Sequence, residues 1–158
     1  MIRFIFISVI SVIFFSCNYP VENSNAMEKK YPLEKSESQW LKELGSERYY
    51  ILRQKGTEPP HSGKYNLFFE SGNYHCGGCG KKLFSSANKF ESNCGWPSFD
   101  QALPGSIIYQ KDTSFNMIRT EILCSQCGGH LGHVFDDGPT NTGQRYCVNS
   151  LSIDFTKD

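Results

Sequence analysis

Four cysteines in two matching turns constrain this chain more than any other feature of its sequence. Cys76 and Cys79 stand in "CGGCG", and Cys124 and Cys127 stand in "CSQCG". A C-x-x-C turn places two thiolates within reach of one ion, and the glycine that follows permits the φ > 0 geometry that aims backbone N–H groups at sulfur. Two such turns complete the tetrahedral four-thiolate shell that structural zinc prefers. The pattern predicts one structural zinc ion per chain, bound by Cys76, Cys79, Cys124 and Cys127.

The spacing of the two turns adds a prediction about the fold. The 44 residues between them (80–123) exceed the usual spacing of a zinc ribbon, so a whole sheet is expected between the two turns. A closed four-thiolate shell leaves no open position for a substrate, so this zinc is expected to clamp the fold. Two redox-active disulfides, or an ordinary disulfide framework, are the alternatives. His75 adjoins the first turn and could be a further ligand, although a surface histidine is the simpler interpretation.

The N-terminus has the features of an export signal. Arg3 precedes an apolar run from Phe4 to Phe15, which is shorter than the roughly 20 residues of a membrane-spanning helix and typical of a secretory signal peptide. "FFSC" resembles a bacterial lipobox, so we expect a signal peptide over 1–16, a lipidated Cys17, and a polar tether over 17–35. The expected product is an exported bacterial lipoprotein on the periplasmic or cell-surface side. The alternative is an ordinary signal peptide or an uncleaved anchor, with an incidental cysteine.

Residues 36–158 are expected to form one domain, since a chain of 158 residues with 39% hydrophobic and 20% charged residues suits a single globular unit. The 16 basic and 16 acidic residues balance, which argues against a nucleic-acid partner. "SESQWLKELG" and "SERYYILRQKG" predict two short helices separated at Gly45, with a Ser36/Gln39 capping box opening the first. The aromatic and β-branched runs that follow predict a mainly β fold of antiparallel sheets: "KYNLFFE", "KKLFSS", "SIIYQK", "NMIRTEILC", "HVFD" and "RYCVNSLSIDF".

The segment "RYCVNSLSID" contains a lone cysteine among alternating residues. Because residues two apart in a strand point the same way, Arg145, Cys147 and Asn149 are expected on one face. The arginine favours the thiolate form, which is the nucleophile, and the asparagine adds a hydrogen-bonding group. A buried structural cysteine is the alternative, but the polar neighbours favour a reactive thiol. We expect this face to continue through Leu151, Ile153 and Phe155.

Two histidines precede that strand in "GGHLGHVFDDGP". Histidine titrates near neutral pH, so His130 and His133 are candidates to donate a proton to an oxygen that gains charge. Satisfied loop histidines, or a second metal pair, are the alternatives.

A tryptophan in "SNCGWPSFD" is a candidate binding residue. Gly95 and Pro97 place Trp96 in a turn that exposes one aromatic face, and sulfur-bearing groups pack well on such faces. A core anchor is the alternative interpretation of Trp96.

Five segments together resemble the B-type methionine sulfoxide reductases, which act on the R epimer: "GTEPPHSGKY", "CGGCG", "CGWPSF", "CGGHLGHVFDDGP" and "RYCVNSLSI". The resemblance covers about residues 36 to 155. It implies two antiparallel β-sheets with a zinc site, Cys147 as nucleophile, Cys94 as resolving thiol, and Trp96 as the residue that holds the sulfoxide methyl group. The chain departs from the family pattern in its export segment and at His61, where a larger apolar or aromatic residue is expected.

The resemblance further implies that His130, His133 and Asn149 surround the sulfoxide oxygen, with Arg145 near the thiolate. The implied reaction forms a sulfenic acid on Cys147 and then a Cys94–Cys147 disulfide. The implied partners are oxidised proteins bearing methionine sulfoxide and a thioredoxin-like reductant, and the expected protein is a monomer. The sequence leaves two other classes open: a C-x-x-C thiol–disulfide oxidoreductase, and a zinc-ribbon binding module without catalytic activity.

Overall fold

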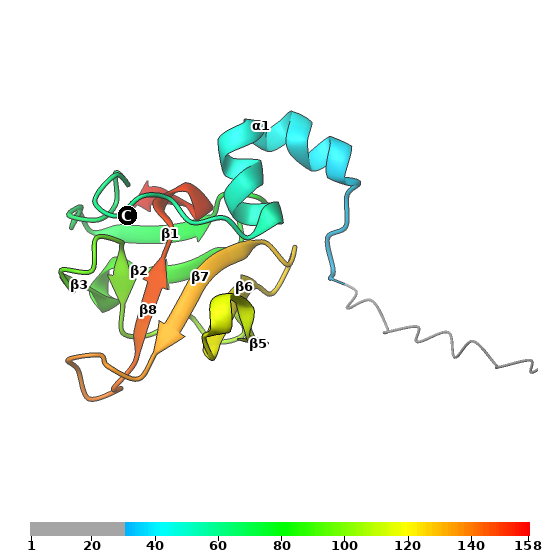
Figure 1. Ribbon diagram of the computed structural model, residues 1–158. Helices are drawn as coiled ribbons and strands as arrows, with labels where there is room; N and C mark the ends of the chain where they lie inside the picture. Colours follow the sequence, from blue (N-terminus) through cyan, green and yellow to red (C-terminus); the bar gives the residue numbers. More distant parts are fainter. Residues whose placement is uncertain (1–30) are drawn as a thin grey trace, which may run out of the picture.

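The computed structural model describes residues 31–158. The predicted signal peptide, Cys17 and most of the expected tether lie outside the described residues. Figure 1 shows the helical segment α1 (Glu37–Gln54) lying over one end of the β-strands. Among residues 31–158, no helix is long and apolar enough to cross a membrane.

The helical segment α1 (Glu37–Gln54) forms as the local signals predict. Ser36 caps its first turn, and the reciprocal bonds of the expected capping box with Gln39 are both present. Gly45, with φ 71° and ψ 169°, is non-helical and divides the segment into two short helices. The buried side chains of α1 are Trp40, Ile51 and Leu52.

Within residues 31–158, nine strands form two antiparallel sheets, which confirms the predicted fold class. The smaller sheet has the order β2-β1-β9, with β1 at Gly72–Cys76, β2 at Lys82–Ser85 and β9 at Ile153–Lys157. The larger sheet has the order β3-β4-β8-β7-β6-β5. Its strands are β3 (Lys89–Phe90), β4 (Ser98–Phe99), β5 (Ile107–Asp112), β6 (Arg119–Cys124), β7 (His130–Phe135) and β8 (Arg145–Val148). Three single 3-10 turns complete the described part: η1 (Ser86–Asn88), η2 (Ser114–Asn116) and η3 (Ser150–Ser152).

The aromatic side chains of the two sheets form a shared core. Phe84 from the smaller sheet stacks on Phe99 from the larger one, with ring centroids 4.4 Å apart and 15° between the planes. Tyr74 of β1 meets the same Phe99 edge-on at 5.0 Å. All three side chains are fully buried, so this aromatic cluster fixes β4, and the strand β8 paired with it, against the smaller sheet.

The segment "KYNLFFE" (64–70) was predicted to be a strand, and this is wrong, because it forms turns and irregular backbone. The ring of Tyr65 packs edge-on against that of Phe68, with centroids 5.6 Å apart. A contact between residues three apart suits a turn, since strand side chains at that spacing point to opposite faces. The aromatic composition therefore reflects packing onto the core rather than a strand.

The predicted continuous face beyond Cys147 is also wrong. β8 ends at Val148, and the chain turns through η3 before β9 begins in the other sheet. The turn is closed by the N–H of Ser152, which donates to the carbonyl of Asn149 (3.0 Å). Leu151, Ile153 and Phe155 therefore do not extend the face that carries Cys147. Instead β9 pairs with β1, and Ile153 lies opposite Cys76.

Candidate active site and metal centre

The four cysteines of the C-x-x-C turns meet in one cluster, as predicted. Their sulfur atoms all lie within 4.8 Å of one another. The Sγ atoms of Cys76 and Cys127 are 3.7 Å apart, and those of Cys79 and Cys124 are 3.5 Å apart. Zn–S bonds of about 2.3 Å place the corners of a tetrahedron about 3.8 Å apart, whereas a disulfide needs about 2.05 Å. The four free thiols therefore fit a tetrahedral metal ion and not a pair of disulfides.

Both turns of the cluster share one backbone geometry. The N–H of Gly80 donates to the carbonyl of Cys76 (2.8 Å), and the N–H of Gly128 donates to that of Cys124 (2.9 Å). The two glycines have φ values of 74° and 70°, which lie in the left-handed region that favours glycine. His75 places its Nδ1 3.1 Å from the carbonyl oxygen of Gly80 and is not one of the clustered ligands. Because Cys76 ends β1 and Cys124 ends β6, the cluster joins the two sheets.

The other two cysteines of residues 31–158, Cys94 and Cys147, lie close together at a second site. Cys147 lies on β8, opposite Ser98 of β4, and Cys94 lies in the turn before β4. Their Sγ atoms are 3.8 Å apart. The hydrogen bond between them lowers the pKa of Cys94 to about 4, and Ser92 donates a further bond of 2.9 Å to that sulfur. The same bond to Cys94, followed by burial, raises the pKa of Cys147. Near neutral pH the pair therefore holds one proton and one negative charge.

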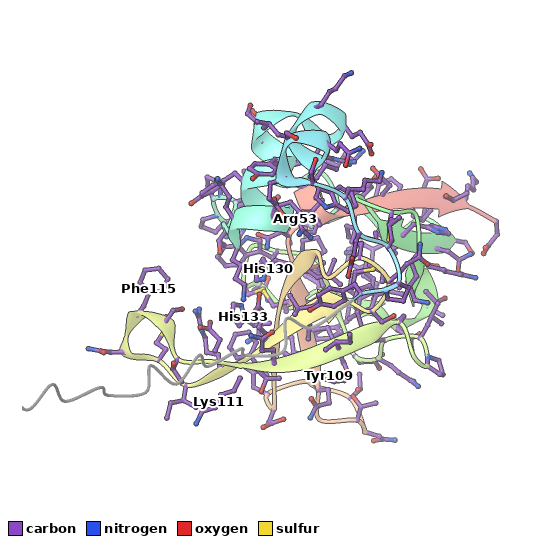
Figure 2. The ribbon with its side chains drawn as sticks, turned by 90° about the vertical axis from the view of Figure 1, so that its right-hand side faces the viewer. Arg53, Tyr109, Lys111, Phe115, His130 and His133 are labelled. Atoms are coloured by element: carbon purple, nitrogen blue, oxygen red, sulfur yellow. The ribbon has the colours of Figure 1, made fainter. Side chains whose placement is uncertain are left out.

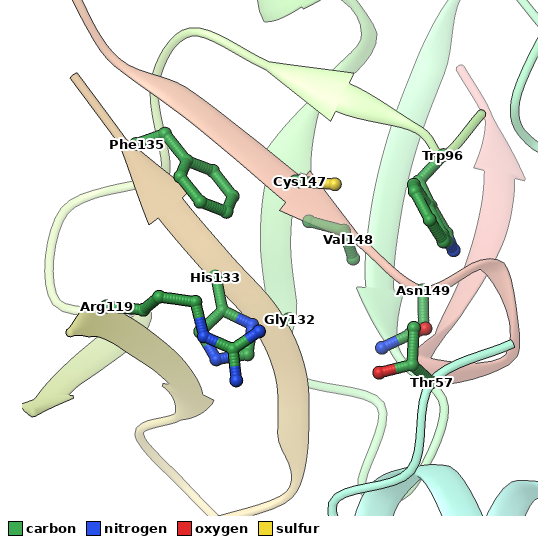
Figure 3. A pocket seen from close by; sticks show the side chains of 9 residues that line it. All are labelled: Thr57, Trp96, Arg119, Gly132, His133, Phe135, Cys147, Val148 and Asn149. Carbon is green, nitrogen blue, oxygen red and sulfur yellow. The ribbon is translucent and has the colours of Figure 1, made fainter. Parts of the chain in front are cut away.

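A cavity of about 130 Å³ opens in front of Cys147. Figure 3 shows the sulfur of Cys147 pointing toward the indole of Trp96, with Arg119 and His133 on the opposite side of the cavity in this view. Thr57 and Asn149 lie along a further wall. The residues that line it thus come from five separate parts of the chain, and the cavity has room for one side chain.

The polar side of the cavity is held by a carboxylate. His133 of β7 lies directly across from Cys147 in the register of the sheet. Its Nε2 lies 2.8 Å from Oδ2 of Asp112, which also accepts a bond of 2.6 Å from Arg119. Burial lowers the pKa of His133, and the bond to Asp112 opposes that shift. The Asp112 carboxylate therefore orients the imidazole and favours its protonated form.

His130 does not line this cavity. It lies in a neighbouring hollow of about 570 Å³, which it shares with His133, beside the β5–β6 hairpin that carries Phe115 at its tip (Figure 2). The two imidazole rings are 5.6 Å apart. Nδ1 of His130 is 2.7 Å from Oε1 of the buried Glu121, whose other oxygen accepts from Lys55 at 2.7 Å. The buried Nε2 of His130 finds no hydrogen-bond partner within residues 31–158.

A family model described as the SelR domain matches residues 44–157. The chain belongs to the SelR-domain family. It is 54% identical over 129 residues to the peptide methionine sulfoxide reductase MsrB of Leptospira interrogans serogroup Icterohaemorrhagiae serovar Lai, a match that covers 81% of this chain and 98% of that protein. A protein of the same name from Methanosarcina mazei is 54% identical over 129 residues (80% and 91%). A third, from Variovorax paradoxus, is 52% identical over 132 residues (80% and 97%). The resemblance drawn from the sequence motifs is thereby confirmed.

Arg145 of this SelR domain lies beside the thiols but not in the cavity wall. Its Nε and one terminal nitrogen donate to both carboxylate oxygens of Asp137, each at 2.8 Å, and its guanidinium lies 4.5 Å from the ring centre of Phe135. The charge of Arg145 lowers the pKa of Cys147, but less than Cys94 and burial raise it. The arginine thus contributes to the electrostatic field at the sulfur from a position fixed by Asp137.

Sequence reasoning missed four side chains of the SelR-domain site: Thr57, Glu58, Asp112 and Arg119. A signal for the arginine was present in "NMIRTEILC", where Arg119 and Glu121 stand two apart and so share one face of β6. Charged residues on one face of a strand indicate a polar site beside it. Thr57 and Glu58 lie in "GTEPPHSGKY", a motif that carried the resemblance without a role for its residues.

Proposed function

We propose that this SelR-domain protein reduces methionine-(R)-sulfoxide in polypeptides to methionine, with electrons from a thioredoxin-like dithiol. The observation that carries the proposal is the position of two free thiols. Cys147 opens into a cavity that fits one side chain, and Cys94 lies 3.8 Å from its sulfur. Family membership and the name of the relatives, peptide methionine sulfoxide reductase MsrB, support the same reaction.

In the proposed chemical step, Cys147 passes its proton to the Cys94 thiolate and attacks the sulfoxide. The sulfoxide oxygen moves to Sγ of Cys147 and takes a proton from His133, which Asp112 orients. The products are methionine and a sulfenic acid on Cys147. The positive charge of Arg145 stabilises the attacking thiolate.

Three further residues are proposed to bind the substrate in this step. Trp96, half-buried in the cavity wall, packs against the sulfoxide methyl group. Asn149 and His130 face the sulfoxide oxygen, the latter from the neighbouring hollow.

The second step regenerates the enzyme. The Cys94 thiol attacks the sulfenic acid, forming a Cys94–Cys147 disulfide and releasing water. The sulfur atoms must approach by about 1.8 Å from their present separation to reach the 2.05 Å of a disulfide. A dithiol donor then supplies two electrons and two protons by thiol–disulfide exchange, and its own thiols become a disulfide.

Turnover of the two sulfoxide epimers tests the function. A soluble form that starts after Tyr19 should convert a peptide containing methionine-(R)-sulfoxide and leave the S epimer unchanged. Cys147→Ser should abolish this turnover and keep the metal content, because Cys147 lies outside the four-cysteine cluster. Parental turnover in Cys147→Ser would end the assignment. Reduction of an unrelated disulfide substrate, without sulfoxide turnover, would instead indicate a thiol–disulfide oxidoreductase.

The metal, the cellular location and the oligomeric state complete the proposal. The sulfur geometry supports one zinc ion per chain, held by Cys76, Cys79, Cys124 and Cys127 as a structural clamp. The N-terminal sequence supports an exported lipoprotein anchored through Cys17. We propose a monomer whose only link to the membrane is its lipid.

A further inference from the structure

Glu58 lies in the "GTEPPHSGKY" motif, and none of the steps proposed above uses it. Its side chain is buried, with 4% of the residue exposed. The carboxylate accepts two backbone hydrogen bonds from the turn that follows β8, one from the N–H of Ser150 (2.6 Å) and one from that of Leu151 (3.0 Å). Bonds from N–H groups to an ionised carboxylate are among the stronger hydrogen bonds in proteins. The side chain thus fixes Glu58 to η3.

The backbone of Glu58 contacts two side chains of the cavity wall. Its N–H donates to Oδ1 of Asn149 (3.1 Å), and its carbonyl accepts from Nε1 of Trp96 (3.1 Å). The indole N–H of Trp96 can only donate a hydrogen bond, and the amide oxygen of Asn149 can only accept one. One residue therefore satisfies both groups and helps to orient both side chains, while Nδ2 of Asn149 also donates to the carbonyl of Leu131 (3.3 Å).

The residues after Glu58 pack tightly against the same parts of the site. The N–H of His61 donates to the carbonyl of Gly95 (2.8 Å), the residue between Cys94 and Trp96. A Cβ added at Gly95 would lie 2.7 Å from Cβ of Pro60, so the segment 58–61 is in direct contact with this turn. The segment joins the turn before β4 to the turn after β8, on either side of Cys147.

We propose that Glu58 is a positioning residue for the reduction. Its carboxylate holds the segment 58–61 on η3, and its peptide groups hold Trp96 and Asn149 in their orientations around the substrate. This inference rests on the proposed function for the role of the cavity. Glu58 contacts neither thiol and acts through the two side chains. Reacting groups displaced by about 1 Å can lose on the order of a hundredfold in rate, so an anchor of this kind controls turnover without taking part in the chemistry.

The test is Glu58→Gln in the protein with its metal bound. Glutamine keeps the shape but replaces one acceptor oxygen with an NH₂ group, which faces a backbone N–H and cannot bond to it. We expect kcat/KM for a methionine-(R)-sulfoxide peptide to fall by roughly tenfold to a hundredfold. Alkylation of Cys147 by iodoacetamide and the metal content should stay unchanged.

A measurement that does not depend on turnover distinguishes a specific role of Glu58 in positioning Trp96 from a general loss of structure in the variant. The chain has two tryptophans, Trp40 and Trp96, and their indole N–H signals can be followed by NMR. In Glu58→Gln the signal of Trp96 should shift and exchange faster with solvent, whereas that of Trp40, a buried residue of α1 with 1% exposure, should not change. Because this measurement needs no substrate, it tests the contact between Glu58 and Trp96 even if the proposed reaction is wrong.

Asp154→Asn provides the matched control. It makes the same change from carboxylate to amide and weakens the ion pair with Arg48 (2.9 Å) away from the cavity. It should lower the melting temperature and leave both indole signals and kcat/KM at parental values.

Two results would overturn the proposal. One is an unchanged Trp96 signal with parental kcat/KM in Glu58→Gln, and the other is an equal change at both tryptophans. If Glu58→Gln does not fold, the same readouts apply to Glu58→Asp. That variant keeps the charge, but its carboxylate is one methylene closer to the backbone and should produce a smaller change of the same kind at Trp96 alone.

Discussion

Replacing Cys94 with serine should separate the chemical step from the regeneration step. In the proposed cycle, Cys94 is the thiol that resolves the sulfenic acid on Cys147, and its sulfur lies 3.8 Å away. A serine hydroxyl cannot form a disulfide, and the other four described thiols belong to the metal cluster. Each chain of Cys94→Ser should therefore release about one methionine in a single burst and then stop.

The structure also predicts how this burst depends on pH. The bond from Cys94 is the largest cause that raises the pKa of Cys147, followed by burial, while Arg145 lowers it. Removing the Cys94 thiolate takes away the largest raising cause, so the pKa of Cys147 should fall. In the parent protein, however, the Cys94 thiolate, which forms above a pKa of about 4, takes the proton of Cys147. In Cys94→Ser that proton must pass to solvent, and burial still raises the pKa of Cys147. Because the thiolate is the nucleophile, the burst rate of Cys94→Ser should reach its plateau at a higher pH than that of the parent protein.

The assay is rapid-quench measurement of methionine release, beside the steady-state rate with a thioredoxin-type donor. After the burst, Cys147 should react with dimedone as a sulfenic acid. The donor-coupled rate should fall to that of a reaction without donor, because the donor attacks a disulfide that can no longer form. Dithiothreitol should restore turnover by reducing the sulfenic acid directly. A donor-coupled rate near the parental value would refute the reasoning and make Cys94 a structural residue.

Three further predictions concern the metal, the proton donor and the N-terminus. Zinc should co-purify at one ion per chain, and Cys124→Ser should unfold the domain at room temperature. The binding of a structural zinc ion contributes about 10–16 kcal/mol to folding, whereas the free energy of unfolding of a typical protein is about 5–15 kcal/mol. Disulfides among the four cysteines of the purified protein would contradict this prediction. Asp112→Asn removes the bond that raises the pKa of His133 while burial continues to lower it, so the protonated imidazole should disappear at a lower pH, and the alkaline limb of a kcat/KM profile should move down in pH. An unmoved limb would exclude His133 as the proton donor. Cys17→Ser should abolish lipid attachment without affecting catalysis in vitro, and mass spectrometry of an unmodified Cys17 in the mature exported protein would rule out the lipoprotein.

Features that depend on a few neighbouring residues could be predicted from the sequence. The capping box at Ser36 and the break at Gly45 each follow from one turn of chain, and both are present. The C-x-x-C turns are equally local, and the chemistry of zinc predicted that they would meet although 44 residues separate them. Sequence spacing was sufficient in these cases because one short-range rule governs each feature.

Features that depend on register or on distant contacts could not be predicted. Asp112 reaches His133 and Arg119 because β5, β6 and β7 pair in one register, which places Asp112 opposite Arg119. Polar and apolar side chains alternate in the same way before and after η3, so the sequence pattern of "RYCVNSLSIDF" predicts one continuous strand. The bend is stabilised by Glu58, whose carboxylate bonds to Ser150, 92 residues away in sequence.

Two sulfur pairs in this fold have nearly the same separation, 3.7 Å for Cys76 and Cys127 and 3.8 Å for Cys94 and Cys147. Distance therefore does not decide which pair an oxidant cross-links. A bound ion protects its four thiolate ligands from oxidation. Once the ion is lost, the four free thiols lie as close to one another as the two thiols of the proposed catalytic pair. In an oxidising solution, metal loss would thus be followed by a cross-link that blocks rebinding. Recovery would then require a reductant before zinc, and the protein's own susceptibility to oxidative damage would depend on how long the ion stays bound.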